Sequence, residues 1–154
     1  MNLRIICLGK DKDAWLSAGI DEYVKRLGPF CKLDILQLPD VSIKQTGTSG
    51  KVIEKESALI LAKLEQDDLV VLLDEKGEEK NSLEFARYLT NIHNVKRVVF
   101  VIGGVYGTSE EIKQRADLCL SLSRFTFTHR MARLILIEQL YRAMMIASGR
   151  SYHI

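Results

Sequence analysis

Residues 98–107 read VVFVIGGVYG, an apolar run that ends at once in a glycine-rich turn. An uninterrupted apolar run bounded by glycine is typical of a strand that is buried on both faces. Gly103, Gly104 and Gly107 have no Cβ, so the backbone of the turn can approach a ligand closely and expose its N–H groups. The same glycines also suit a plain strand-to-helix turn, and this stretch alone leaves both interpretations open.

On both sides of this turn, strand and helix patterns alternate along the chain. Apolar or alternating runs predict five strands, at residues 3–8, 31–39, 69–73, 98–102 and 118–122. Apolar residues at helical spacing, with capping residues, predict five helices, at about 16–27, 51–64, 82–92, after Thr108 or Ser109, and 131–147. Residues 40–50 are expected to form a long loop, and residues 75–81 a charged turn followed by Ser82 as a helix cap.

This order predicts the α/β class, with a mostly parallel five- to six-stranded sheet and helices on both faces. Nothing indicates a second domain, so residues 1–154 are expected to form one. In open sheets of this kind, ligands bind beyond the carboxyl ends of the strands. Three such ends stand out, at residues 73–74, 103–104 and 122–129.

Composition points to a cytoplasmic globular protein. Hydrophobic residues make up 47% and charged residues 27%, which is ordinary for such a protein. There is no apolar run long enough for a membrane span and no secretory signal pattern at residues 1–10. Cys7, Cys31 and Cys119 are widely spaced and odd in number, which favours buried free thiols in a reducing cytoplasm over disulfides or a metal site.

Basic residues gather near the C-terminus, although the net charge is only +2. Residues 124–154 contain five arginines and one acid, Glu138. Arginines can grip RNA phosphates with paired hydrogen bonds, and they can equally form a solvated set of surface charges. A nucleic-acid partner would therefore depend on this local patch and not on the overall charge.

Several common catalytic motifs are absent. The first predicted strand is followed by one glycine, Gly9, and not by GxGxxG, which argues against a dinucleotide-dependent oxidoreductase. Residues 47–51 do not have the spacing of a P-loop. The chain also lacks GxSxG, HExxH and any Cys/His cluster at metal-ligand spacing.

The last predicted helix is unusually apolar and carries an internal charge pair. Glu138 lies within an apolar run, and Arg142 follows four residues later, in the favourable orientation for a helix ion pair. A helix this apolar either lies centrally in the domain or packs against a partner subunit. Before it, Phe125 and Phe127 either anchor a loop or line a site, together with neighbouring hydroxyls and His129.

Taken together, four segments resemble one family. They are the turn at 102–107, the stretch at 120–129, the helix residues 133–143 and the terminal pair Tyr152-His153. Their order and spacing resemble the RlmH-type pseudouridine-N3 methyltransferases of 23S ribosomal RNA, which belong to the SPOUT class. Val105 and Thr128 depart from the family pattern, which often has proline at both positions.

The resemblance implies a fold and a cofactor site. The fold would carry a C-terminal trefoil knot, which is rare enough that periodicity alone would exclude it. The methyl donor, S-adenosylmethionine, would lie among three loops. The implied cofactor-binding residues are Leu73, Gly103, Gly104, Leu122, Ser123, Arg124, Phe125, Thr126 and Phe127. The family also implies a homodimer in which each site is completed by the other subunit.

The resemblance further places His129, Arg142, Tyr152 and His153 around the target nucleotide. His153 is a candidate base and Arg142 a candidate for stabilising the developing anion. No metal is needed for such a transfer, and the C-terminal arginines would contact RNA. Because the net charge is small, the expected substrate is ribosomal RNA within an assembled ribosomal subunit.

Other functions remain open at this stage. A ribosome-binding protein without catalytic activity would have the fold but no affinity for the methyl donor. A SPOUT enzyme acting on transfer RNA or on a ribose 2′-hydroxyl would differ in the nucleotide that it methylates. A nucleotide-dependent oxidoreductase is disfavoured by the missing dinucleotide motif.

Overall fold

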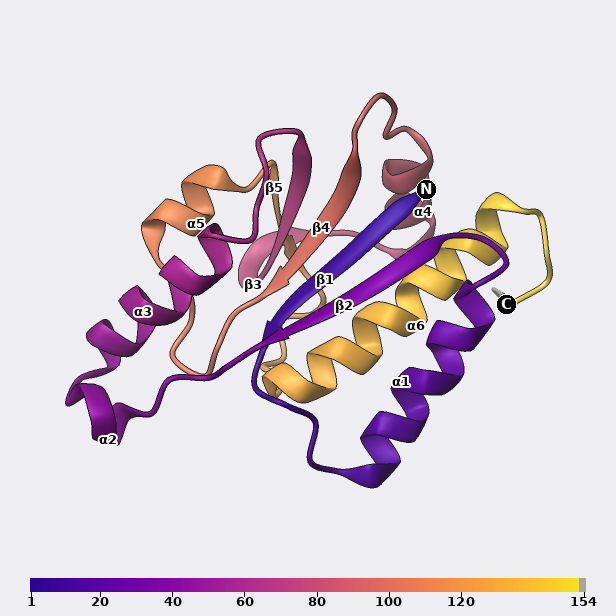
Figure 1. The fold of residues 1–154 in the computed structure, drawn as a ribbon. Coiled ribbons are helices and arrows are strands. Elements are labelled where there is room, and N and C mark those ends of the chain that lie inside the picture. The colour runs from indigo at the N-terminus through magenta and orange to yellow at the C-terminus, as the bar shows by residue number, and fades with distance from the viewer. Residues whose placement is uncertain (153–154) are drawn as a thin grey trace.

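Five parallel strands form one sheet in the computed structural model, which describes residues 1–152 (Figure 1). The strand order is β2–β1–β4–β3–β5, so the first strand lies inside the sheet and the last lies at an edge. The strands are β1 (Asn2–Leu8), β2 (Lys32–Leu38), β3 (Asp68–Glu79), β4 (Arg97–Ile102) and β5 (Leu118–Ser121). The predicted α/β class and parallel sheet are confirmed.

Helices cover both faces of the sheet. They are α1 (Ala14–Leu27), α2 (Ile43–Thr46), α3 (Ser49–Leu61), α4 (Ser82–Thr90), α5 (Glu110–Arg115) and α6 (His129–Ala147). Side chains of α1, α4 and α6 pack on one face, and those of α3 and α5 pack on the other. Figure 1 shows α1 and α6 running beside each other, with α3 and α5 on the opposite side of the sheet.

The core explains why the central strands are continuously apolar. Ile5 faces the α1–α4–α6 layer while its neighbour Ile6 faces the α3–α5 layer, and both are fully buried. On β4, Phe100 likewise faces the α1–α4–α6 layer and Val99 faces the α3–α5 layer. Since successive side chains point to opposite faces, a strand buried on both sides needs apolar residues at every position.

Strand β3 is longer than the sequence indicates, so the prediction of a charged turn at 75–81 is wrong. After a register shift beyond Leu73, Glu78 pairs with Leu120 and Glu79 with Ser121. Gly77 makes this continuation possible, because a Cβ there would lie 2.6 Å from the carbonyl oxygen of Cys119. The extension is polar because it runs past the covered part of the sheet, and hydrophobic periodicity therefore misses it.

Helix α4 is capped by Asn81 and not by Ser82. The Asn81 side chain accepts from the backbone N–H of Glu84, whose carboxylate accepts from the N–H of Asn81, forming a capping box. Ser82 is instead the first helical residue, and its hydroxyl donates to Gln139 of α6 over 2.8 Å. Ser109 caps α5, as one of the two expected residues.

The segment at 40–50 is not a continuous loop. It contains the short helix α2, capped by the Ser42 side chain, and Thr48 caps α3, which begins at Ser49. Helix α6 begins at His129, two residues before the expected start at Met131, because Thr128 caps it. The boundaries shift because short polar caps carry no hydrophobic pattern.

No helix within residues 1–152 is long and apolar enough to cross a membrane. The strand order by itself does not establish the trefoil knot, which stays a prediction.

Candidate active site

A cavity of about 1060 Å³ opens beside residues 73–76 of β3 and beyond the ends of β4 and β5. Leu73 pairs with Ile102 on one side and with Leu120 on the other, so the segments that follow these three residues start level with one another. This volume is slightly above the range of about 300–1,000 Å³ that is typical of small-molecule pockets. The three strand ends selected from the sequence therefore surround one cavity.

Most of the predicted cofactor-binding residues line this cavity. They are Leu73, Gly103, Gly104, Leu122, Ser123, Phe125, Thr126 and Phe127. Arg124 is not among the lining residues. Its side chain is 90% exposed, and its Nε lies 3.5 Å from Glu79.

The turn after β4 needs glycine for packing reasons at two positions. A Cβ on Gly103 would lie 2.6 Å from Cγ2 of Thr108, and a Cβ on Gly104 would overlap Oε2 of Glu56. Gly107 has a φ of +94°, in the region that favours glycine. The backbone of the glycine turn therefore forms this wall of the cavity, and it packs directly against the side chains of Thr108 and Glu56.

Glu56 is the side chain behind Gly104, and it is 4% exposed. Its Oε1 accepts from the backbone N–H of Val41 over 2.9 Å, whereas its Oε2 has no hydrogen-bond partner. Burial raises the pKa of this carboxyl. The sequence held a signal for this residue, because Glu56 lies four residues from both Val52 and Ile60, which are buried.

The loop after β5 is fixed by its hydroxyls. Ser121 donates to the carbonyl of Ser123 over 3.0 Å, and Oγ of Ser123 accepts from the N–H of Phe125 over 3.0 Å. The hydroxyl of Thr126 donates to Glu75 over 3.0 Å, which joins this loop to β3. Phe125 is nonetheless 81% exposed at the rim of the cavity. The small hydroxyl residues noted in the sequence thus shape the loop, and they leave an aromatic ring in solvent.

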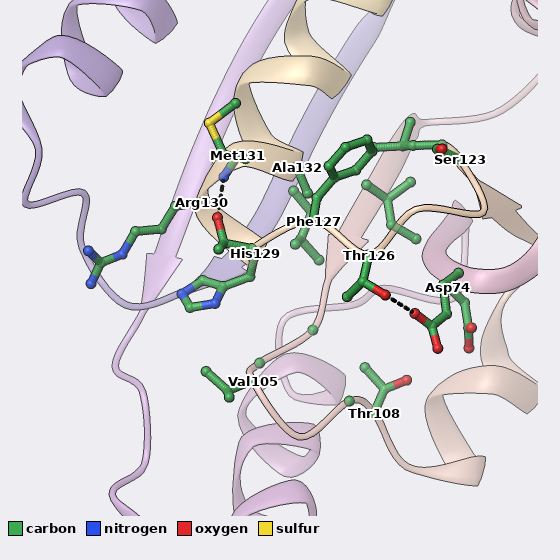
Figure 2. A pocket seen from close by; sticks show the side chains of 18 of the residues that line it. Asp74, Val105, Thr108, Ser123, Thr126, Phe127, His129, Arg130, Met131 and Ala132 are labelled. Atoms are coloured by element: carbon green, nitrogen blue, oxygen red, sulfur yellow. Dashed lines mark hydrogen bonds between the residues drawn. The ribbon is translucent and has the colours of Figure 1, made fainter.

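His129 lies at the cavity, as the first residue of α6 (Figure 2). Burial is the main cause that lowers the pKa of its imidazole below the ordinary value of 6.5, and the charges of Arg133 and Arg130 lower it further. The imidazole is therefore neutral near pH 7, and one ring nitrogen can accept a proton or a hydrogen bond. Figure 2 shows His129 and Arg130 on one side of Phe127, with Thr126 and Asp74 on the other.

A fourth segment, after β1, also borders the cavity, and the sequence did not single it out. Asp13 and Trp15 are among the lining residues. The segment is fixed by Arg133 of α6, which is 1% exposed, pairs with Asp11 over 2.8 Å and donates to the carbonyl of Leu8. The prediction that the C-terminal arginines contact RNA is therefore wrong for Arg133, because its guanidinium is buried inside the fold.

Arg142 and Tyr152 lie far from this cavity within one chain. Arg142 lies thirteen positions after His129 in α6, which is about 20 Å along a helix. Arg142 donates to Oε1 of Glu138 over 2.7 Å, and its guanidinium lies 4.8 Å from the centre of the Tyr152 ring. One chain therefore does not bring His129 together with Arg142 and Tyr152.

Tyr152 is held in a network of its own. Its hydroxyl donates to Glu138 over 3.2 Å and lies 3.3 Å from the hydroxyl of Tyr23 on α1. Burial and the hydrogen bond with Tyr23 raise the pKa of Tyr152 well above its ordinary value. Tyr152 is thus a hydrogen-bond donor and not a base at neutral pH. His153, the predicted base, lies outside the described residues.

Within residues 1–152, no group of three or more His, Cys, Asp or Glu side chains is arranged to hold a metal ion.

Residues 1–153 match the model of a family described as "Predicted SPOUT methyltransferase". The chain is 39% identical to the ribosomal RNA large subunit methyltransferase H of Carboxydothermus hydrogenoformans and 42% identical to that of Ligilactobacillus salivarius. Both alignments cover 99% of each chain. The protein of the same name from Prochlorococcus marinus is 44% identical, over 97% of this chain and 94% of its own.

Among solved structures, a probable methylase family protein from Haemophilus influenzae Rd KW20 has a similar fold. It superposes with a TM-score of 0.58 at 11% identity, covering 99% of this chain and 70% of its own. At this identity the likeness concerns the fold alone.

Proposed function

Because the chain belongs to the SPOUT methyltransferase family, we propose that it transfers a methyl group from S-adenosylmethionine to N3 of a pseudouridine in 23S ribosomal RNA. Relatives named ribosomal RNA large subunit methyltransferase H match it over nearly its whole length, which supports this target. The observation that carries the proposal is the cavity lined by residues 73–76 of β3 and by the loops after β4 and β5. We further propose that the protein acts in the cytoplasm, where ribosomes assemble.

The cavity fits the methyl donor in three respects. Its volume accommodates a nucleoside-sized ligand with space for part of a substrate. The glycine turn presents backbone without side chains, which suits the recognition of an adenine and a ribose through N–H and C=O groups. The carboxylates of Asp74 and Glu75 border the same space, together with Lys76 and Lys113, and a carboxylate beside a sulfonium cation attracts it.

The donor supplies an electrophilic methyl group, so catalysis depends on positioning and on removal of the N3 proton of the target base. In this proposal, residues of the three loops align the donor with the base. His129 borders the cavity as a neutral imidazole, so it accepts a hydrogen bond from the nucleotide or takes up its proton. Arg142 stabilises the negative charge that develops on the base.

The distance of about 20 Å along α6 requires a second subunit for this mechanism. We propose a homodimer in which Arg142 and Tyr152 of one subunit, together with His153, complete the cavity of the other. In this arrangement, the carboxylate of Glu138 fixes the Arg142 guanidinium before substrate binds. Tyr152 donates its hydroxyl hydrogen bond and packs against the same guanidinium.

Methyl transfer from a tritiated donor tests the function directly. Whole ribosomes, isolated large subunits and free ribosomal RNA are compared as substrates, and the methylated nucleotide is mapped by mass spectrometry. We expect transfer to a pseudouridine in assembled particles and little transfer to free RNA. Methylation of transfer RNA or of a ribose hydroxyl would overturn the proposed target, and lack of donor binding by calorimetry would overturn the activity.

Mixed dimers test the shared site. His129→Ala and Tyr152→Ala subunits, each inactive alone, are unfolded, mixed and refolded together. If the two residues act across the subunit boundary, each heterodimer has one intact site, and the mixture recovers about one quarter of wild-type activity. Refolded mixtures of each variant with itself are the controls. No recovery in mixtures that contain heterodimers would contradict the composite site.

A further inference from the structure

Trp15 is exposed at the edge of the cavity, on the side of β1. It is the only tryptophan of the chain, it is 63% exposed, and it borders the same space as His129 and Arg130. Leaving so large an aromatic surface in water is unfavourable, and residues of this kind concentrate at binding surfaces. We propose that Trp15 is a platform on which a base of the ribosomal RNA substrate stacks, an inference that rests on the function proposed above.

Two arginines of α6 hold the segment that precedes Trp15. The buried Arg133 of α6 pairs with Asp11 and donates to the carbonyl of Leu8, so it fixes the chain as it leaves β1. Arg130, one turn earlier on α6, lies 3.6 Å from Asp13. The residues just before Trp15 are therefore tied to the first turns of α6, which also line the cavity at His129. Because the backbone of this segment is already restrained, ordering it costs little conformational freedom when a base stacks on the ring.

The charges around Trp15 suit RNA. Both aspartates of the segment are paired with arginines of α6, Asp11 with Arg133 and Asp13 with Arg130. Lys10 and Lys12 are exposed, and within residues 1–152 neither takes part in an ion pair. The segment thus offers two cations beside an aromatic ring. Phosphates that flank a base stacked on the ring would lie within reach of these lysines.

The position of Trp15 separates it from the proposed methyl-donor site. The donor segments lie in β3 at residues 73–76 and after β4 and β5, whereas Trp15 lies at the start of α1, which follows β1, the neighbour of β4 on the other side. Trp15 therefore belongs to the side of the cavity with His129 and Arg130, which Figure 2 shows apart from Thr126 and Asp74. This is the side on which the target nucleotide would be held.

Three variants test this role. Trp15→Ala removes the ring, Trp15→Phe keeps an aromatic face, and Leu83→Ala removes an exposed apolar side chain of α4 away from the cavity. Methyl transfer to large ribosomal subunits is measured at saturating S-adenosylmethionine. We expect Trp15→Ala to raise KM for the subunit about tenfold, Trp15→Phe to restore most of the loss, and Leu83→Ala to match the wild type.

Further measurements test whether Trp15 instead contacts the methyl donor or a second subunit. The donor Kd from calorimetry and the oligomeric state from ultracentrifugation are expected to be unchanged in Trp15→Ala. Because Trp15 is the only tryptophan, its fluorescence is also expected to change little when the donor saturates the protein. An unchanged KM in Trp15→Ala, strong quenching by the donor, or loss of the dimer would each overturn the inference. Absence of any transfer by the wild type would instead overturn the proposed function.

Discussion

Replacing Gly104 by alanine tests how the wall of the cavity is built. The new Cβ would overlap Oε2 of Glu56 and would lie 3.0 Å from its Cδ. Glu56 is buried, and its other oxygen is bonded to the N–H of Val41. Relief of the overlap therefore moves the glycine turn into the cavity, or rotates Glu56 and breaks the bond to Val41.

Either outcome has a cost that can be estimated. Overpacking typically costs about 1–3 kcal/mol, and an unsatisfied buried donor costs a similar amount. We expect Gly104→Ala to lower the free energy of unfolding by about 2 kcal/mol, which lowers Tm by roughly 4–8 °C in a chain of this size. A comparable free energy lost from donor binding would weaken its Kd more than about tenfold.

Calorimetry measures both effects, Tm by thermal unfolding and Kd by titration with S-adenosylmethionine. Gly50→Ala is the matched control, because a Cβ at Gly50 in α3 meets nothing within 4 Å. Alanine is favoured over glycine in a helix by about 0.5–1 kcal/mol, so this control should be neutral or slightly stabilising. A double-mutant cycle with Glu56→Ala isolates the overlap, since Gly104→Ala should cost less when Glu56 is absent. Wild-type Tm and Kd in Gly104→Ala, or an equal cost in both backgrounds, would refute this account of the wall.

Three further predictions follow from the described contacts. The folded protein lowers the pKa of His129 below its ordinary 6.5, so the unfolded chain binds the proton more readily. The neutral imidazole therefore contributes to stability above about pH 6.5, and this contribution is lost as the pH falls through the folded-state pKa. His129→Gln should therefore flatten the dependence of Tm on pH below about pH 6.5, and an equally steep profile would contradict the shift. Gly77→Ala should lower the free energy of unfolding in urea by about 1–3 kcal/mol, because its Cβ would meet the backbone of β5, and an unchanged midpoint would show that β3 does not continue past Gly77. Burial raises the pKa of Cys7 to about 11, so alkylation at about pH 8, followed by mass spectrometry, should label the partly exposed Cys119 much faster than Cys7. Equal rates of labelling would argue against the buried position of Cys7.

The sheet and the positions of the three segments that line the cavity were predictable because their signals are local. Val98 to Ile102 is apolar at every position, as is typical of a short strand buried on both faces, and glycines follow at once. The level pairing of Leu73 with Ile102 and Leu120 then brings the loops together. Any parallel sheet with these strand ends would place the loops at one edge, so the site followed from the fold class.

The unpredicted features depend on contacts between distant segments. Glu56 meets Gly104 across 48 positions of the sequence, and Arg133 reaches Asp11 across 122. Charged residues are rarely buried unless they are paired, so composition assigned Arg133 to the surface. The place of Trp15 at the cavity likewise depends on the position of β1 inside the sheet, which strand periodicity does not reveal.

The ion pairs of α6 leave few of its arginines available for RNA phosphates. Arg130, Arg133 and Arg142 are all engaged within the fold, by Asp13, Asp11 and Glu138 respectively. These arginines therefore position loops and side chains and do not simply supply mobile positive charge. An enzyme that neutralises few phosphates gains little from counterion release, and its affinity depends only weakly on salt. Recognition must then come from the shape of a folded ribosomal surface, from stacking and from a second subunit, which is why assembled particles are the expected substrate.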